Sequence, residues 1–483
     1  TLLGRDGFRR GMDTYIARHD NSAATIPDFL AAMAEGGDVD LGDFASWYRQ
    51  AGTPELTVED HYDPATRRYE LTLSQRTSPT PGQPEKQPVP IPVALGLLGP
   101  NGDEMPTRLD SEAAAISGTR VLVCDRPRQI FSFVDVAAPP VPSLLRGLSA
   151  PVKLLDVPLD RLKFLAIHDT DPVARWDAGQ QVGSRILVDR IALQQAGAAL
   201  PPLDPDLIAA LHRTLADADR DPAFAAEALV LPSEASLADA MAVVDVEAIH
   251  AVRHEARTAI AAALAEPLAA TYRRLDDPDP YHTDGVAIGR RALRNVCLAY
   301  LAAGDKQEGA KLALAQFDAQ QNMTDVLAAL GALVDNAGPE RDSALARFYG
   351  RWQDDPLVVD KWFGLQARSS QPGTVAAVRA LTAHPAYTRA NPNRVRALVG
   401  AFSQGNQLHF HEASGDGYAF LAEEVLAIDP PNPLLAARLV QALGQWRRHD
   451  PARQALMRGA LERIRATPGL STNTYEMVTK SLG

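Results

Sequence analysis

An aspartate or asparagine followed directly by proline recurs along this 483-residue chain, and this dipeptide restricts the possible fold more than any other feature. The first side chain can accept a hydrogen bond from the opening turn of a helix, and proline suits the first helical position because it needs no N–H partner there. Each dipeptide therefore predicts a helix start, so the 36 prolines separate helices and do not indicate disorder. The dipeptides that we interpret as helix starts begin at Asp171, Asp204, Asp221, Asp355, Asn391, Asn432 and Asp450.

Two of these helix starts resemble each other. Asn-Pro-Asn-Arg-Val-Arg-Ala-Leu-Val begins at Asn391, and Asn-Pro-Leu-Leu-Ala-Ala-Arg-Leu-Val begins 41 residues later, at Asn432. That spacing is typical of paired-helix repeats of the HEAT or armadillo type. We therefore predict an α-helical superhelical domain over residues 154–483.

The first third of the chain has a different pattern. Residues 1–54 have helical spacing of apolar residues, with Thr25 as an expected N-cap before Pro27. Residues 55–153 contain short segments that alternate with period two, which predicts a small β-sandwich. The expected strands include Leu56–Val58, Tyr69–Leu73, Ile91–Leu98, Thr119–Val123, Gln129–Phe133, Pro139–Pro142 and Leu148–Val152. The predicted fold is multidomain and mainly α: a helical stub (1–54), a β-sandwich (55–153) and the helical superhelix (154–483).

The helical stub, residues 1–54, needs a partner surface. Its aromatic residues Phe8, Tyr15, Phe29 and Trp47 are expected to be partly uncovered, or covered by the sandwich, the helical domain or a second chain. The chain starts with Thr inside a helix-like pattern. We therefore expect it to be the later part of a longer protein.

The composition excludes several classes of partner. The formal net charge is −12, so the surface offers no general attraction to nucleic acid or to anionic lipid. No apolar run reaches the roughly 18 residues of a membrane-spanning helix. Cys124 and Cys297 are too few for a disulfide framework, which is typical of a reducing compartment. We predict a cytoplasmic protein without nucleic-acid or membrane partners.

Two histidine pairs are the candidates for a metal site. His250 and His254 stand four residues apart and can share a helix face, as zinc ligands do, but Glu255 follows the second histidine instead of lying between them. A solvated, charged helix face explains this pattern as well, and we favour it. His409 and His411 alternate and do not converge, which favours a structural role. We predict no metal ligand in this chain.

No motif of a self-contained active site is present. The chain lacks a nucleophile elbow, a Walker A loop and a dinucleotide fingerprint. The glycine-rich segment 414–417 lacks the lysine of a phosphate loop and is expected to be a turn before the helix at Tyr418. We predict no catalytic residue here.

Arg396 and Arg438 are the candidate substrate-binding residues. Each falls in the second turn of one of the two similar helices, so both guanidinium groups can emerge on one surface if the helices stack as neighbours. Two arginines facing a cavity would hold a carboxylate through bidentate hydrogen bonds. Ordinary surface or inter-helix ion pairs are the alternative.

A series of short motifs in the same order along the chain identifies a family resemblance. In the stub these motifs are Gly7-Phe8, Gly11, Tyr15, Arg18-His19-Asp20, Ala23-Ala24-Thr25, Asp28-Phe29, Phe44, Trp47 and Gly52-Thr53-Pro54. They continue with Gln75-Arg76-Thr77, Glu85-Lys86-Gln87-Pro88, Ile91-Pro92, Leu148 to Lys153, Arg175-Trp176-Asp177-Ala178 and Asn391 to Arg396. With these motifs the chain resembles the aminopeptidase N (membrane alanyl aminopeptidase) family of zinc peptidases, and its bacterial branch most closely.

The resemblance implies a four-domain enzyme of which this chain is the later part: the last helices of a thermolysin-like catalytic domain, the sandwich and the helical domain. Such enzymes remove single N-terminal residues from peptides, using a zinc-bound water, a glutamate base and a tyrosine. The Gly-x-Met-Glu-Asn and His-Glu-x-x-His motifs are absent here, so the resemblance carries no zinc or catalytic residue over. Arg396 and Arg438 match arginines that face the catalytic cavity.

The prediction is therefore a non-catalytic C-terminal portion that caps the active site and shapes the substrate cavity, with zinc in the full-length enzyme only. Its expected partners are the upstream catalytic domain and peptide substrates. An independent helical-repeat scaffold that binds peptide or protein is the alternative.

Overall fold

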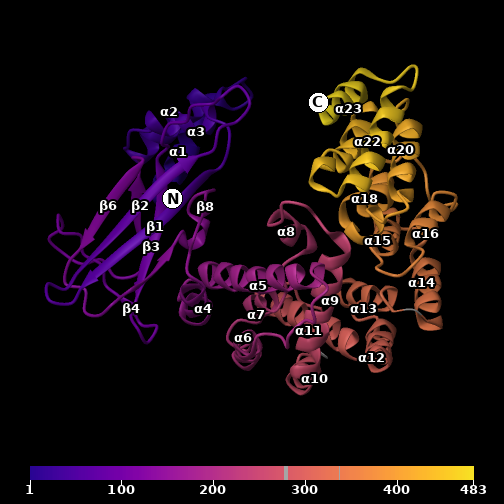
Figure 1. The fold of residues 1–483 in the computed structure, drawn as a ribbon, viewed down its shortest axis with the longest axis horizontal. Coiled ribbons are helices and arrows are strands. Elements are labelled where there is room, and N and C mark those ends of the chain that lie inside the picture. The colour runs from indigo at the N-terminus through magenta and orange to yellow at the C-terminus, as the bar shows by residue number, and fades with distance from the viewer. Residues whose placement is uncertain (277–280, 337) are drawn as a thin grey trace. The chain divides into compact units, whose positions relative to one another are not determined.

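The computed structural model describes residues 1–276, 281–336 and 338–483. The chain divides into two compact units, Thr1–Val182 (unit 1) and Gly183–Gly483 (unit 2), which are coloured from indigo to yellow along the chain in Figure 1. Unit 1 contains the first helices, the strands and helix α4 (Leu159–His168). Helix α5 (Pro172–Gln195) crosses from unit 1 into unit 2.

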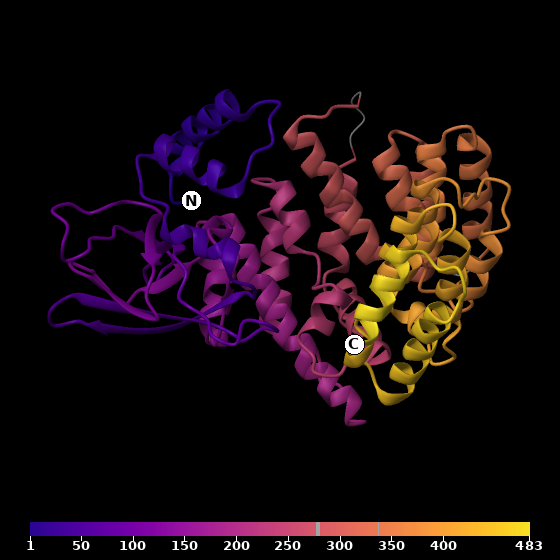
Figure 2. The same cartoon turned by 90° about the horizontal axis from the view of Figure 1, so that it is seen from above.

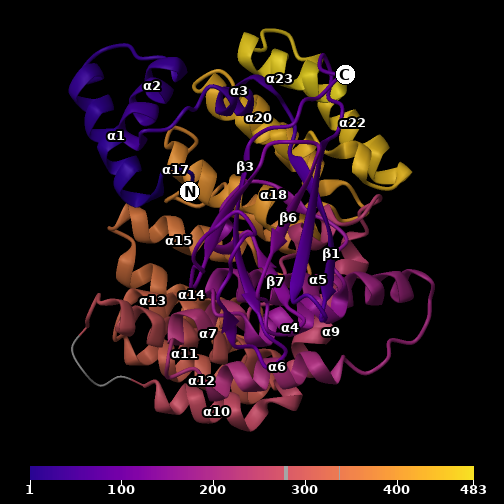
Figure 3. The same ribbon diagram turned by 90° about the vertical axis from the view of Figure 1, so that its left-hand side faces the viewer.

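The chain opens with two packed helices, α1 (Gly4–His19) and α2 (Ile26–Gly37), which lie side by side in Figure 3. Thr25 caps α2 as predicted: its hydroxyl accepts from the backbone N–H of Asp28, whose carboxylate accepts from the Thr25 N–H at 2.9 Å. A Cβ on Gly36 would lie 2.1 Å from the backbone nitrogen of Gly11. The two helices therefore cross at a contact that only glycine permits.

The end of the helical stub is attached to the sandwich. After a 3₁₀ turn (Asp43–Ala45), helix α3 (Ser46–Arg49) carries Trp47 against the sandwich core, and the indole N–H donates to the Pro90 carbonyl at 2.9 Å. The side-chain amide of Gln50 exchanges two hydrogen bonds with the backbone of Gln87, at 3.0 and 2.8 Å. On α1, by contrast, Phe8 is 50% exposed and Ile16 is 53% exposed.

The β-sandwich consists of two sheets with the strand orders β6-β2-β1-β8 and β4-β3-β5, with β7 paired to β3. Long strands β1 and β2 form an antiparallel hairpin in which Pro54 pairs with Thr77 and Asp63 with Arg68. The core between the sheets includes Tyr69 and Phe133. The strands are β1 (Pro54–Asp63), β2 (Arg68–Thr77), β3 (Ile91–Leu98), β4 (Glu104–Met105), β5 (Arg120–Cys124), β6 (Arg128–Phe133), β7 (Val141–Leu144) and β8 (Lys153–Leu154).

The predicted strand at Leu148–Val152 is wrong. Residues Arg146–Leu148 form a 3₁₀ turn, and Leu145, Gly147 and Leu148 all have left-handed φ angles between 52° and 60°. The hydroxyl of Ser149 donates to the Pro92 carbonyl at 2.9 Å and accepts from the Ala94 N–H at 3.0 Å. The Ser149 side chain therefore makes the hydrogen bonds to β3 that the backbone of a neighbouring strand would otherwise make.

A buried arginine joins the sandwich to α4 within unit 1. Arg146 is 3% exposed; its guanidinium donates to Asp169 at 3.0 Å and Ser143 at 2.8 Å and pairs with Glu104. It lies over Gly96, where a Cβ would be 2.1 Å from the guanidinium carbon. Strand β3, the turn after β7 and the end of α4 thus share one polar centre.

Unit 2 consists of helices that follow one another in chain order, as the colour gradient from magenta to yellow shows in Figure 2. Every predicted Asp-Pro or Asn-Pro start is confirmed, because a helix begins at each of these prolines. The helices are α6 (Pro205–Ala216), α7 (Pro222–Ala228), α8 (Glu234–Asp239), α9 (Val246–Ala263), α10 (Ala265–Arg274), α11 (Gly285–Gly304), α12 (Lys306–Ala319), α13 (Met323–Val334), α14 (Pro339–Trp352), α15 (Pro356–Ala367), α16 (Thr374–Leu381), α17 (Pro392–Val395), α18 (Ala401–Gly405), α19 (Gln407–Phe410), α20 (Asp416–Ile428), α21 (Pro433–Val440), α22 (Pro451–Arg465) and α23 (Thr472–Leu482).

The end of unit 2 contacts its beginning. The Val244 N–H donates to the Arg448 carbonyl at 2.8 Å, and the Arg448 guanidinium pairs with Asp239 at 2.9 Å. Arg453 on α22 pairs with Glu247 on α9. These contacts connect segments about 200 residues apart in sequence. Among the helices that the structure describes, none is both long and apolar enough to cross a membrane.

Candidate functional site

The helix starts that carry the two candidate arginines have the predicted caps. The Asn391 side chain accepts from the Asn393 N–H at 3.0 Å, and the Asn432 side chain accepts from the Leu435 N–H at 3.1 Å. In both cases proline occupies the first helical position. This local chemistry determines where Arg396 and Arg438 lie along their helices.

Arg396 stands at an irregular point of its helix. Residues Arg396–Gly400 form a π-helical turn between α17 and α18, and such turns are rare and often occur at functional sites. The side chain is exposed and donates to the Asn393 side-chain oxygen at 2.9 Å. The guanidinium therefore retains donors for an external anion.

Arg438 is exposed on α21 and has no hydrogen bond or ion pair to any side chain that the structure describes. Leu434, one turn earlier on the same helix, is 69% exposed. An unpaired guanidinium one turn from an exposed leucine can hold a carboxylate and contact an apolar group next to it.

The helices that carry the two arginines pack against different neighbouring helices. The turn that carries Arg396 packs against α15 and α18, whereas α21 packs against α20 and α23. No hydrogen bond or ion pair within the described ranges links Arg396 to Arg438. That both bind one ligand stays a prediction.

Arg394 is a neighbouring residue that the sequence reasoning missed. It is 5% exposed, its guanidinium lies 3.0 Å from the Asp360 carboxylate, and it stacks over the Phe363 ring at 5.2 Å. Burial raises the pKa of Asp360, while the charge of Arg394 opposes that shift. Arg394 attaches the start of α17 to α15 and so positions the π turn. The Arg-x-Arg spacing was the only signal, since burial is not visible in the sequence.

The histidine candidates are engaged in structural contacts. The rings of His250 and His254 stack with centroids 6.2 Å apart, and His250 lies 2.7 Å from a Glu234 oxygen. Glu255 pairs with Arg190 at 2.6 Å and not with either histidine. Among the residues that the structure describes, no three His, Cys, Asp or Glu side chains group as a metal ion requires.

The second histidine pair and the glycine-rich segment also have structural surroundings. His409 approaches the Ser370 carbonyl at 3.0 Å, and His411 approaches the Tyr418 hydroxyl at 2.9 Å, so the two imidazoles have separate partners. Gly415 has a φ of 76° immediately before α20. The segment is the turn that we expected, although the helix begins at Asp416, two residues before Tyr418.

Two family models match the chain. One is an Ig-like fold, described as a domain of unknown function (DUF3458), and it matches residues 52–156. The other is described as a domain of unknown function (DUF3458_C) with ARM repeats, and it matches residues 159–483, more than half of the chain. The chain belongs to the DUF3458_C family. The ARM-repeat description and the Ig-like match confirm the predicted fold class: mainly α, with a small β-sandwich before a large helical array.

Curated relatives of the DUF3458_C chain are named aminopeptidase N. The protein from Escherichia coli (strain K12) is 40% identical and the one from Caulobacter vibrioides is 43% identical, each across 100% of this chain. The alignments cover 55% and 54% of those relatives, so the chain spans about half their length. The crystal structure of Legionella pneumophila aminopeptidase A in complex with aspartic acid matches with a TM-score of 0.85 at 29% identity, covering 100% of this chain and 55% of that one. The predicted resemblance to bacterial aminopeptidase N is confirmed.

Proposed function

We propose that this chain is the non-catalytic C-terminal portion of a zinc aminopeptidase, where it covers the active site and shapes the cavity for peptide substrates. The observation that carries the proposal is 40% identity to an aminopeptidase N across all 483 residues, in an alignment that covers only 55% of that relative. In this proposal the uncovered part supplies the catalytic motifs that the chain lacks. The side chains that the structure describes do not fit a zinc ion, since they offer no group of three ligands.

The exposed apolar face of α1 supports this assignment. Phe8 and Ile16 are each about half exposed, although they belong to a helix that packs against α2. Large exposed apolar patches mark contacts with other protein surfaces, and two half-exposed apolar side chains on one helix are consistent with the edge of such a contact. We assign it to the catalytic part of the same enzyme, because the sandwich already binds the end of the stub through Trp47 and Gln50.

In this role Arg396 and Arg438 would bind the carboxylate of a peptide substrate. Both are exposed, and Arg438 has no partner among the described side chains. The proposed compartment is the cytoplasm, because both cysteines are free and buried.

The first test measures turnover. This chain alone is expected to hydrolyse no aminoacyl-anilide, with or without added zinc. A longer chain that also contains the part of the relatives not covered here is expected to release the anilide in a zinc-dependent reaction. Zinc-dependent turnover by the purified 483-residue chain would contradict the proposal.

The second test concerns the arginines in that longer chain. Arg396→Ala and Arg438→Ala are each expected to raise the KM for peptides about tenfold or more, because a hydrogen bond to a charged group contributes about 1.5–3 kcal/mol. The KM for aminoacyl-anilides, which lack a downstream carboxylate, should change little. Arg458→Ala, at an exposed ion pair on α22, is the matched control. Equal effects on both substrate types would assign the arginines a structural role.

A further inference from the structure

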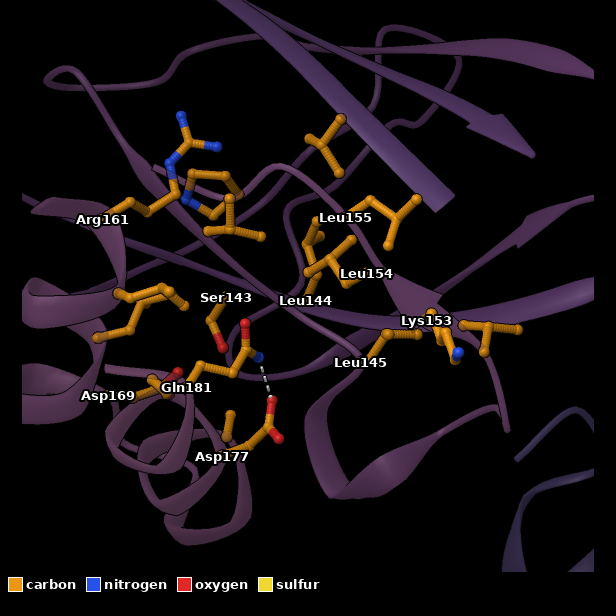
Figure 4. A pocket seen from close by; sticks show the side chains of 18 of the residues that line it. Ser143, Leu144, Leu145, Lys153, Leu154, Leu155, Arg161, Asp169, Asp177 and Gln181 are labelled. Carbon is orange, nitrogen blue, oxygen red and sulfur yellow. Dashed lines mark hydrogen bonds between the residues drawn. The ribbon is translucent and has the colours of Figure 1, made fainter. Parts of the chain in front are cut away.

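Unit 1 contains a cavity of about 370 Å³ between the sandwich, α4 and the start of α5, shown close up in Figure 4. Its walls come from β7, residues 152–158, α4 and the first turns of α5. Pockets that bind small molecules have volumes of this order, mostly apolar walls and a few polar groups. No part of the aminopeptidase proposal uses this cavity.

Aliphatic side chains form most of the wall. Leu144, Leu145, Leu154 and Leu155 are labelled in Figure 4, and Leu162 and Leu165 of α4 also line the cavity. A hydrocarbon chain placed here would be removed from water, at about 25 cal/mol for each Å² of apolar surface buried.

Asp177 gives the cavity one unpaired negative charge. Its carboxylate accepts from the Gln181 side-chain amide at 2.8 Å and forms no ion pair with any cation that the structure describes. Burial raises the pKa of Asp177, against the weaker opposite effect of the Gln181 hydrogen bond. A partly buried carboxylate without a counter-ion gains most from a cation that enters with the ligand.

A second buried carboxylate, Asp169, offers the cavity a further hydrogen-bond acceptor. Asp169 also lines the cavity, is 1% exposed and has one carboxylate oxygen without a hydrogen-bond partner, while its other oxygen accepts from Arg146. The two basic side chains of the lining do not neutralise this end. Arg161 is already bound to Asp60 at 2.8 Å, and Lys153 lies well apart from Asp177 in Figure 4.

We propose that this cavity is a binding site for a small aliphatic primary amine, with the ammonium donating to Asp177 and the hydrocarbon chain packed against the leucines. An ammonium has three donors, and the Asp177 carboxylate and the Gln181 side-chain oxygen supply acceptors. A charge-assisted hydrogen bond of this kind is about twice as strong as a neutral one. An alkyl anion would instead have to use Lys153.

The experiment is calorimetric titration of the full chain with hexylammonium chloride, compared with 1-hexanol and sodium hexanoate. Hexylammonium is expected to bind saturably and at least tenfold more tightly than either analogue, because the alkyl chain is the same and only the head group differs. Equal or tighter binding of hexanol or hexanoate overturns the proposal, and so does the absence of saturable binding at millimolar concentration. This comparison needs no variant.

Two variants then assign the binding to this cavity. Asp177→Asn is expected to weaken hexylammonium binding about tenfold or more while leaving hexanol binding unchanged. Asp160→Asn, at an exposed position of α4 outside the lining, is the matched control and should bind like the parent chain. Ala174→Phe, which fills the cavity, should abolish binding of both ligands. Unchanged hexylammonium affinity in a folded Asp177→Asn variant overturns the proposal.

Discussion

Arg146→Ala is expected to destabilise unit 1 by about 3–5 kcal/mol, the cost of removing one partner from a buried ion pair. Arg146 pairs with Glu104 and with Asp169, which is 1% exposed. Without the guanidinium, the Asp169 carboxylate is left buried with no compensating charge. For a unit of this size the loss corresponds to a decrease in Tm on the order of 10 °C.

The expected loss of stability is large because one guanidinium forms hydrogen bonds with several segments that are distant in sequence. It donates to Ser143 of β7, to Thr119 before β5 and to Asp169 after α4, at 2.8, 3.1 and 3.0 Å. Gly96→Ala tests the same centre from β3, because the new Cβ would lie 2.1 Å from the guanidinium carbon. Gly96→Ala should therefore destabilise the same elements with Arg146 still present.

Hydrogen exchange measured by mass spectrometry is the appropriate measurement, since it follows unit 1 separately from unit 2. Peptides from β3, β7 and α4 should lose protection together in both variants. Arg68→Ala is the matched control, because its ion pair with Asp110 is exposed and contributes at most about 1 kcal/mol. If Arg146→Ala lost no more protection than Arg68→Ala, the proposal that Arg146 stabilises unit 1 would be wrong.

Unit 2 is expected to lose stability between pH 6.5 and pH 5 through a buried histidine pair. His411 and His449 are each 5% exposed and stack with ring centroids 4.3 Å apart. Burial lowers the pKa of His411 to about 3, with further lowering by His449 and Arg453. Burial and the charge of Arg453 also lower the pKa of His449, although Asp450 opposes this.

The direction of the effect follows from proton uptake. An unfolded histidine has a pKa of about 6.5, so above that pH neither state binds the proton and stability does not depend on this pair. Below it the unfolded chain takes up protons that the folded pair does not. The free energy of unfolding should then fall by up to about 1.4 kcal/mol per pH unit for each histidine. For His411 the loss continues until the pH approaches its folded value of about 3.

Variants can isolate the contribution of the pair. His449→Phe keeps an aromatic ring against His411, and His411→Gln keeps an acceptor for the Tyr418 hydroxyl. Urea unfolding at pH 6.5 and at pH 5 should show about half of the parent's pH dependence in each variant and little in the double variant. His212→Gln, at an exposed position of α6, is the control and should retain the parent's slope. A double variant with the parent's slope would refute the assignment.

The His411–His449 pair also predicts which segments of unit 2 unfold locally first as the pH decreases. The N–H of Arg453 Nε donates to the His411 carbonyl at 2.6 Å, and Val244 binds the backbone one residue before His449. Protection of segments 238–250 and 446–453 against hydrogen exchange should therefore fall first as the pH decreases.

The helix starts could be predicted because a cap involves residues two or three positions apart. Asn391, Asn432 and the aspartates before the other prolines bind N–H groups of their own first turns, so no distant contact is needed. Strands β1 and β2 were also visible from their alternation of residue types, whereas β3 is buried throughout and was visible as a short apolar run that ends at Gly99-Pro100. Leu148–Val152 alternates too, but Leu148 is left-handed at the end of the turn that carries Arg146, and the Ser149 hydroxyl binds the backbone of β3.

The candidate arginines show where sequence reasoning stopped. Their positions along the helices followed from the caps, and both side chains are exposed in the structure. The π turn at Arg396 did not follow, because it depends on how α17 is held against α15 through the Arg394–Asp360 pair. Whether Arg396 and Arg438 bind the same ligand depends on how their two helices, whose starts are 41 residues apart, pack in the superhelix. It also depends on the shape of the substrate.

By itself the sequence determined the order of stub, strands and helices, the helix starts and the resemblance to aminopeptidase N, because these depend on local chemistry or on ordered matches along the chain. Only the tertiary structure decided which charges are buried together. Arg146 with Asp169, His411 with His449, and Asp177 in its leucine-lined cavity owe their properties to loss of water. Desolvation arises only when segments distant in sequence enclose the same group, so no local pattern of residues encodes it.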